Sequence, residues 1–116
     1  MSVYAYIGCR TTKERNARGK GISVYSVEKG RWELLQLLEG EVNPSYLCLN
    51  EAQNRLYAIH GDFCQVSSYE IHEDGTISSI NTVDTHGTNP VHLTLDPTGK
   101  WIFVANLQTG SVSVIP

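Results

Sequence analysis

The chain has 116 residues, of which 41% are hydrophobic and 18% are charged, and its formal net charge is −3. A chain of this length is typically one domain, and its slightly acidic balance argues against general nucleic-acid affinity, which requires a basic surface. No apolar run approaches the roughly 20 residues of a spanning helix, and the first residues lack the basic head and apolar middle of a signal peptide. We therefore expect a cytoplasmic protein without a nucleic-acid or membrane partner.

The first two elements are a short strand and a long basic loop. Residues 3–8 are aromatic and β-branched, which predicts a strand. Residues 10–20 carry five basic side chains against one acid. Arginine offers a planar fork of donors to a carboxylate or phosphate, so Arg10, Arg15 and Arg18 are candidate substrate-binding residues. The simpler alternative is a solvated surface loop.

Two further strands are predicted before residue 42. Residues 21–27 alternate in a way that suits a strand with both faces partly covered. Residues 32–38, WELLQLL, also fit a short helix by their leucine spacing. Their counterpart at 76–83 follows an Asp-Gly hairpin turn and is rich in β-branched residues, which favours strands at both places.

The chain contains an internal repeat. Residues 89–114 align with residues 43–68 without a gap when shifted by 46 positions, and both copies begin with Asn-Pro. The middle unit is predicted to hold four strands, at 46–49, 55–59, 65–71 and 77–83. Because no helix is long enough for a parallel crossover, the sheets should be antiparallel meanders.

Four antiparallel strands that recur at this period are typical of a β-propeller, whose blades repeat every 40 to 50 residues or so. A β-sandwich would explain the short strands but not the repeat. We predict an all-β fold of about two and a half blades. Residues 1–42 supply three strands of one blade, 43–88 a complete blade, and 89–116 three strands of the next.

A ring of about four to eight blades is needed for closure, so this chain is not expected to close alone. Uncapped terminal repeats expose apolar faces and strand edges. We expect the missing blades of a longer protein to cover them, with self-association of copies as the alternative.

The sequence also resembles the seven-bladed lactonase family, which includes propeller-type 6-phosphogluconolactonases and fungal-type carboxy-muconate lactonising enzymes. The resemblance covers the whole chain, which corresponds to about a third of a family member. It rests on four segments: YIGCRTT (6–12), GISVYSV (21–27), NPSYLCLNEAQNRLYAIHGD (43–62) and NPVHLTLDPTGKWIFVANLQTGSVSV (89–114). It implies a cytoplasmic, cofactor-free enzyme whose partner is a small anionic lactone or carboxylate substrate.

The resemblance also points to residues around one mouth of the central channel. His92 matches the family's histidine position, Asn106 matches a second polar position, and Arg10 falls in the first strand-end loop. Lactone opening needs a base to activate water, and histidine suits proton transfer because its unperturbed pKa is about 6.5. His92 is therefore the candidate catalytic acid or base, with a structural histidine as the alternative. Alternation places His92, Thr94 and Asp96 opposite the apolar Val91, Leu93 and Leu95.

His60 occupies the same repeat position as Asn106, where both are expected to face one mouth, unless His60 only caps a loop. The sequence departs from the family here, because members often carry Asn-Glu where this chain has His60-Gly61. Asp62 is a candidate substitute for that acid.

Metal binding is not expected, because the four histidines are widely spaced and the three cysteines form no CxxC pair. Hydrolysis of a lactone and cyclisation to a lactone use the same residue types, so both activities stay open. A non-catalytic binding module is the third hypothesis.

Overall fold

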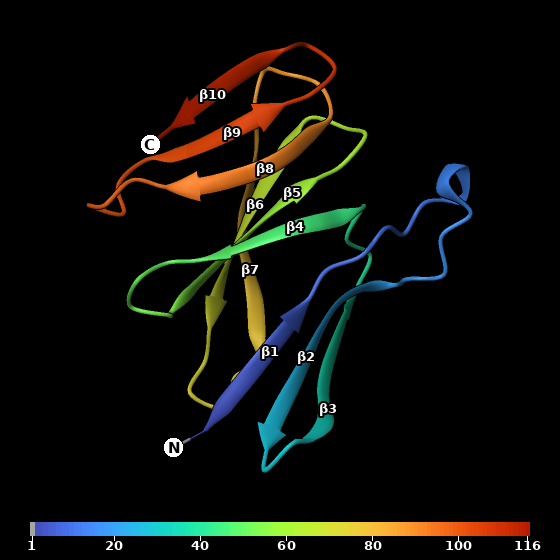
Figure 1. The fold of residues 1–116 in the computed structure, drawn as a ribbon, viewed down its shortest axis with the longest axis vertical. Coiled ribbons are helices and arrows are strands. Elements are labelled where there is room, and N and C mark those ends of the chain that lie inside the picture. Colours follow the sequence, from blue (N-terminus) through green and yellow to red (C-terminus); the bar gives the residue numbers. More distant parts are fainter. Residues whose placement is uncertain (1) are drawn as a thin grey trace.

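The computed structural model describes residues 2–116, which fold into ten β-strands and one short 3₁₀ turn (Figure 1). The strands form three antiparallel sheets, and the middle sheet lies between the other two. The elements are β1 (Val3–Ile7), η1 (Lys13–Arg15), β2 (Gly21–Glu28), β3 (Arg31–Glu39), β4 (Pro44–Leu49), β5 (Arg55–His60), β6 (Gln65–Ile71), β7 (Ile77–Asp84), β8 (Pro90–Leu95), β9 (Ile102–Asn106) and β10 (Ser111–Ile115).

Each sheet is a simple meander, in the orders β1-β2-β3, β4-β5-β6-β7 and β8-β9-β10. This confirms the predicted all-β fold of incomplete propeller blades. The segment 32–38 is a strand within β3 rather than a helix. It pairs with β2 through a hairpin whose turn residues Lys29 and Gly30 both have positive φ, at 51° and 78°. Such a turn matches the twist of antiparallel strands and holds the leucine-rich segment in an extended conformation.

Two apolar cores join the sheets. The first core lies between the first and second sheets, and the second core lies between the second and third. Their fully buried members are Ile22, Val24, Leu56, Ala58, Tyr69 and Ile77 in the first core, and Ile59, Val66, Leu93 and Val104 in the second. Alternate side chains of the middle sheet therefore face opposite neighbours, as expected where sheets stack face to face.

The two repeated Asn-Pro segments begin β4 and β8, and each is followed by a β-bulge. Pro90 pairs with Asn106 and His92 pairs with Ala105, so Val91 has no partner opposite it. The prediction that Val91 shares the apolar face of Leu93 is wrong for this reason: Val91 is 38% exposed whereas Leu93 is 1% exposed. A bulged residue adds one position and shifts the alternation around it.

Asn43 and Asn89, the asparagines of these segments, tie neighbouring blades together. Both have a left-handed backbone, with φ of 43° and 58°, which asparagine tolerates better than most residues. The Asn43 Oδ1 accepts a hydrogen bond of 2.7 Å from the Thr11 amide, and the Asn89 Oδ1 accepts one of 2.8 Å from the Asp62 amide. Each asparagine thus fixes the loop that follows a strand of the preceding blade.

The outer faces of the first and third sheets expose apolar side chains. Trp32 and Leu34 on β3 are 56% and 54% exposed, and Val112 and Val114 on β10 are 67% and 54% exposed. These sheet faces lack the packing partner that the middle sheet has on both sides, as expected for an incomplete ring. Within residues 2–116, no helix is both long and apolar enough to span a membrane.

Candidate functional site at the mouth of the channel

The candidate residues gather where strand ends from all three sheets meet. In the second sheet Pro44 pairs with His60, and in the third sheet Pro90 pairs with Asn106, so each first strand starts beside the end of its neighbour. The end of β1 at Ile7 completes this edge, which we call the mouth edge. The strands β4 and β8 lie side by side with the same direction (Figure 1). They are the innermost strands of their sheets, so their free edges line the channel of a propeller.

Asp62, just beyond the end of β5, binds two arginines of the basic loop. The Arg15 Nε and Nη2 donate to its two carboxylate oxygens at 2.6 Å and 2.5 Å. The Arg10 Nη1 lies 2.9 Å from Asp62 Oδ2. These hydrogen bonds from Arg15, together with the charge of Arg10, lower the pKa of Asp62 to about 2. Asp62 therefore stays ionised near neutral pH. It can replace the negative charge of the family's acid at this place, but it is unsuited to donate a proton.

The guanidinium of Arg10 rests against Gly61. A Cβ placed on Gly61 would lie 2.7 Å from Arg10 Nη1 and 2.6 Å from the Ser45 hydroxyl oxygen. Arg10 therefore crosses from the first blade to the bulge of β4 in the second blade. Only a glycine at position 61 leaves room for this approach.

Arg18 is placed apart from the other two arginines. It is exposed, and among residues 2–116 no hydrogen bond or ion pair involves its side chain. The structure thus brings Arg10 and Arg15 together on Asp62, and leaves Arg18 in the solvated part of the loop.

His92 lies on the innermost strand β8 and is exposed, on the opposite side from the buried Leu93. Its ring packs on Tyr46 of β4, with ring centroids 4.5 Å apart and planes inclined by 49°. Tyr46 and His92 hold the same repeat position, so both face the channel side of adjacent strands. No described residue hydrogen-bonds to either imidazole nitrogen, so both are free for proton transfer.

His60 and Asn106 do not face the mouth, which corrects that expectation. His60 is 5% exposed, and its Nδ1 and Nε2 lie 2.5 Å from Val42 O and 2.6 Å from Ser67 Oγ. Because a carbonyl only accepts, His60 Nδ1 carries a hydrogen. Asn106 is 3% exposed and donates to Ser113 Oγ at 2.9 Å. Each side chain is occupied by one partner in its own sheet and one in the connection before that sheet: Ser67 and Val42 for His60, and Ser113 and Thr85 for Asn106. For His60 this agrees with the loop-capping alternative.

Metal-ligating groups are dispersed. Across residues 2–116, no group of three or more His, Cys, Asp or Glu side chains is placed to hold a metal ion. The three cysteines are free thiols, and burial raises the pKa of Cys48 and Cys64. His72 and His86 are exposed.

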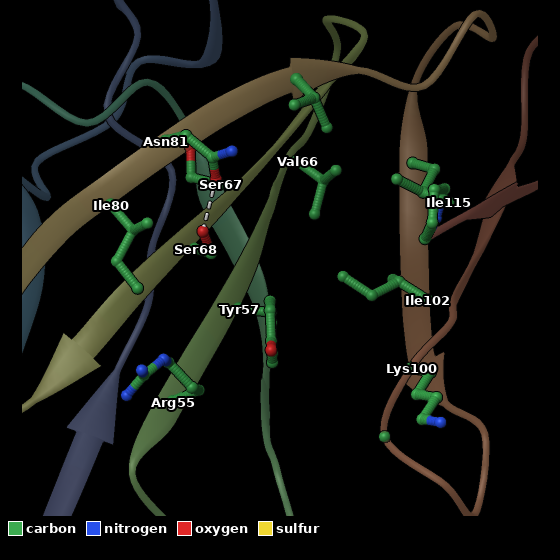
Figure 2. Close-up of a pocket in the computed structure, with 13 residues that line it drawn as sticks. Arg55, Tyr57, Val66, Ser67, Ser68, Ile80, Asn81, Lys100, Ile102 and Ile115 are labelled. Atoms are coloured by element: carbon green, nitrogen blue, oxygen red, sulfur yellow. Dashed lines mark hydrogen bonds between the residues drawn. The ribbon is translucent and has the colours of Figure 1, made fainter.

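A separate groove of about 310 Å³ lies between the second and third sheets, away from the mouth edge. Figure 2 shows Ile102 and Ile115 on one wall and Val66 and Tyr57 on the other. The third sheet has three strands where the second has four. The groove therefore adjoins the position of a fourth strand and is separate from the mouth edge.

The family described as "Lactonase, 7-bladed beta-propeller" matches residues 4–116. The chain belongs to this family. Among the family's curated members, the 6-phosphogluconolactonase of Formosa agariphila is 29% identical over 118 aligned positions, which cover 93% of this chain and 32% of that protein. The chain thus spans about a third of the length of the curated relatives it matches.

Solved structures of the same kind agree with this assignment. A candidate 6-phosphogluconolactonase of Bacteroides fragilis superposes with a TM-score of 0.86 at 30% identity, and the match covers 99% of this chain and 32% of that one. The periplasmic gluconolactonase PpgL of Pseudomonas aeruginosa superposes with a TM-score of 0.79 at 24% identity, and the match covers 100% of this chain and 35% of that one. At this identity the likeness supports the fold alone. The three sheets are therefore blades of a lactonase-family propeller, and the mouth edge is one end of its channel.

Sequence reasoning missed two contacts of the candidate site. The role of Tyr46 could have been found, because the repeat alignment places it directly on His92. The joining of Arg10 and Arg15 on Asp62 had no such signal, because the loop 10–20 has no counterpart in the later blades. Its contact with Asp62 depends on tertiary structure alone.

Proposed function

We propose that this chain is part of a propeller lactonase that hydrolyses a sugar-acid lactone such as 6-phosphogluconolactone. The observation that carries the proposal is the exposed His92, whose ring packs on Tyr46 at the channel side of the two innermost strands. The names of the family's relatives support the reaction class. The remaining two-thirds of such a protein would supply the other walls of the site.

In the proposed reaction, His92 acts as the base. Its neutral imidazole takes a proton from water while the water oxygen bonds to the lactone carbonyl carbon. The tetrahedral oxyanion collapses, the ring C–O bond breaks, and the imidazolium returns the proton to the leaving alkoxide. Arg10 at the same mouth binds the acid group of the substrate. His60 and Asn106 hold the strand ends in place and make no direct contact with substrate.

The proposal includes a cytoplasmic location for the protein. We also expect no activity from residues 1–116 alone, because the exposed faces around Leu34 and Val112 need partner blades. Blades of the same polypeptide are the proposed partners of these faces.

The test is a lactonase assay on the full-length protein. With 6-phosphogluconolactone as substrate and spontaneous opening subtracted, His92→Gln should lower kcat by about 10²- to 10⁴-fold, the usual contribution of a general base. His86→Gln is the matched control, since His86 is exposed in an outer connection, and it should leave the rate unchanged. A full-length protein that opens no lactone, or a His92→Gln rate equal to the parent's, would exclude the proposal.

A further inference from the structure

The positive charge of this chain is concentrated in the loop 10–20, which follows the end of β1 at the mouth edge. Residues 10–20 hold five of the nine basic side chains but one of the twelve acidic ones. The rest of the chain is therefore strongly acidic, with four basic and eleven acidic side chains. Such a local reversal of sign attracts anions to one place on a protein that otherwise repels them.

The two arginines that reach Asp62 use different parts of their guanidinium groups. Arg15 donates through Nε and Nη2, the two atoms of its side-on fork. Arg10 contacts Asp62 through Nη1, which is buried and makes the ion pair without a well-directed hydrogen bond. The side-on fork of Arg15 is thus occupied by Asp62, whereas Arg10 contacts Asp62 through Nη1 alone.

The side-on fork of Arg10 is left free. Its side chain is 35% exposed, and within residues 2–116 no atom accepts a hydrogen bond from its Nε or Nη2. These two donors match the spacing of two oxygens on a carboxylate or a phosphate monoester. A held guanidinium loses less conformational entropy on binding than a free one does.

Gly61 and Asp62 determine where that fork points. Asp62 holds Nη1, and the missing Cβ of Gly61 lets the guanidinium approach the chain beside Ser45. The φ of Gly61 is not positive, so alanine fits its backbone. An added methyl group would act on Arg10 and Ser45 rather than on the fold of the loop.

We infer that Arg10 determines specificity for an oxyanion of the substrate, and that Asp62 and Gly61 are positioning residues that act through it. The inference rests on the proposed function for the identity of the substrate. The ligand class is a carboxylate or phosphate monoester bound bidentately at the fork. Arg15 neutralises Asp62, so the cluster keeps the net positive charge that the anion requires.

The experiment measures anion binding separately from turnover. Calorimetry on the full-length protein would titrate inorganic phosphate, 6-phosphogluconate and gluconate. Arg10→Lys keeps the charge but removes the fork, and should weaken binding of 6-phosphogluconate by about 10-fold or more, as for a lost charged hydrogen bond. Arg18→Ala, a change at an exposed arginine of the same loop, should alter binding by less than twofold. Binding of inorganic phosphate and 6-phosphogluconate but not of gluconate identifies phosphate as the ligand group, and equal binding of gluconate and 6-phosphogluconate identifies the carboxylate.

The positioning role is tested with Gly61→Ala. If Gly61 acts through Arg10, the variant should raise KM by about 10-fold with kcat nearly unchanged, and should have no added effect in an Arg10→Ala background. Equal affinity of the parent and Arg10→Lys for 6-phosphogluconate, or an equal loss in Arg18→Ala, would overturn the inference. Arg10-dependent phosphate binding without lactone opening would instead refute only the proposed function.

Discussion

Replacing Asn43 by alanine is expected to loosen the connection between the first two blades. The side chain is fully buried. Its Oδ1 accepts from the amides of Thr11 and Thr12 at 2.7 Å and 3.2 Å, and its Nδ2 donates to Gly61 O at 3.0 Å. Alanine removes these three bonds, together with two longer ones of 3.4 Å from Nδ2 to Thr12 Oγ1 and Asp62 Oδ2, and leaves the three backbone groups without their partner.

The expected loss is about 4 kcal/mol. Each of three unsatisfied polar groups costs about 1 kcal/mol when water partly replaces the lost partner, and a left-handed alanine costs about 1 kcal/mol more. Asn16 supplies the control, because it has a φ of 55°, is exposed, and makes no side-chain hydrogen bond within the described residues. Asn16→Ala should therefore cost only the backbone component, about 1 kcal/mol.

The assay is hydrogen exchange of the full-length protein, supported by urea unfolding. The difference of about 3 kcal/mol between the variants corresponds to about 10²-fold faster exchange at the amides of Thr11 and Thr12. Amides of β6 and β7, which do not contact Asn43, should keep their protection in both variants. If Asn43→Ala accelerates exchange no more than Asn16→Ala does, the interblade role of the asparagine is refuted.

Two further predictions concern charge and packing. The pKa of Asp62 in the folded protein, about 2, lies below its value in the unfolded chain. The ion pairs of Asp62 therefore stabilise the protein above about pH 4 and are lost as the pH falls toward 2. Over this range the urea midpoint of the parent should fall more than that of Asp62→Asn. Tyr46→Leu removes the ring on which His92 packs and should lower kcat by about 2- to 10-fold, the usual value of an aromatic pair, whereas Tyr46→Phe keeps the ring and should retain activity. Parallel pH curves, or equal rates for the Leu and Phe variants, would contradict these two predictions.

The repeated parts of the fold could be predicted because each position occurs more than once. The counterpart at 76–83 predicts a strand for the ambiguous segment 32–38, and β3 confirms this prediction. The bulges at Ser45 and Val91 could not be predicted, because they change the alternation without changing the kinds of residue present. The exposure of Val91 is a consequence of pairing between strands, which local sequence does not encode.

The site was predictable to a smaller extent. The exposed position of His92 follows from alternation beyond the bulge. His60 has the same place in its repeat as Asn106, yet no sequence pattern shows that Ser67 and Val42 occupy both of its nitrogens. Polar residues at strand ends are as suited to bonds within the sheet as to a ligand, so their type alone does not separate the two roles.

Residues inside the repeat and residues outside it contribute different parts of the proposed site: the histidine at the channel and the arginine for the anion. Equivalent positions in successive blades project in the same way, so β4 and β8 present Tyr46 and His92 as a packed pair. A repeat of this kind gives equivalent side chains the same position in each blade but adds no cluster of charge. The loop 10–20, which lacks a repeat counterpart, supplies the cations, and Asp62 and Gly61 orient Arg10. Under the proposed function, changes in this loop should therefore alter which anion is bound while leaving the position of His92 intact.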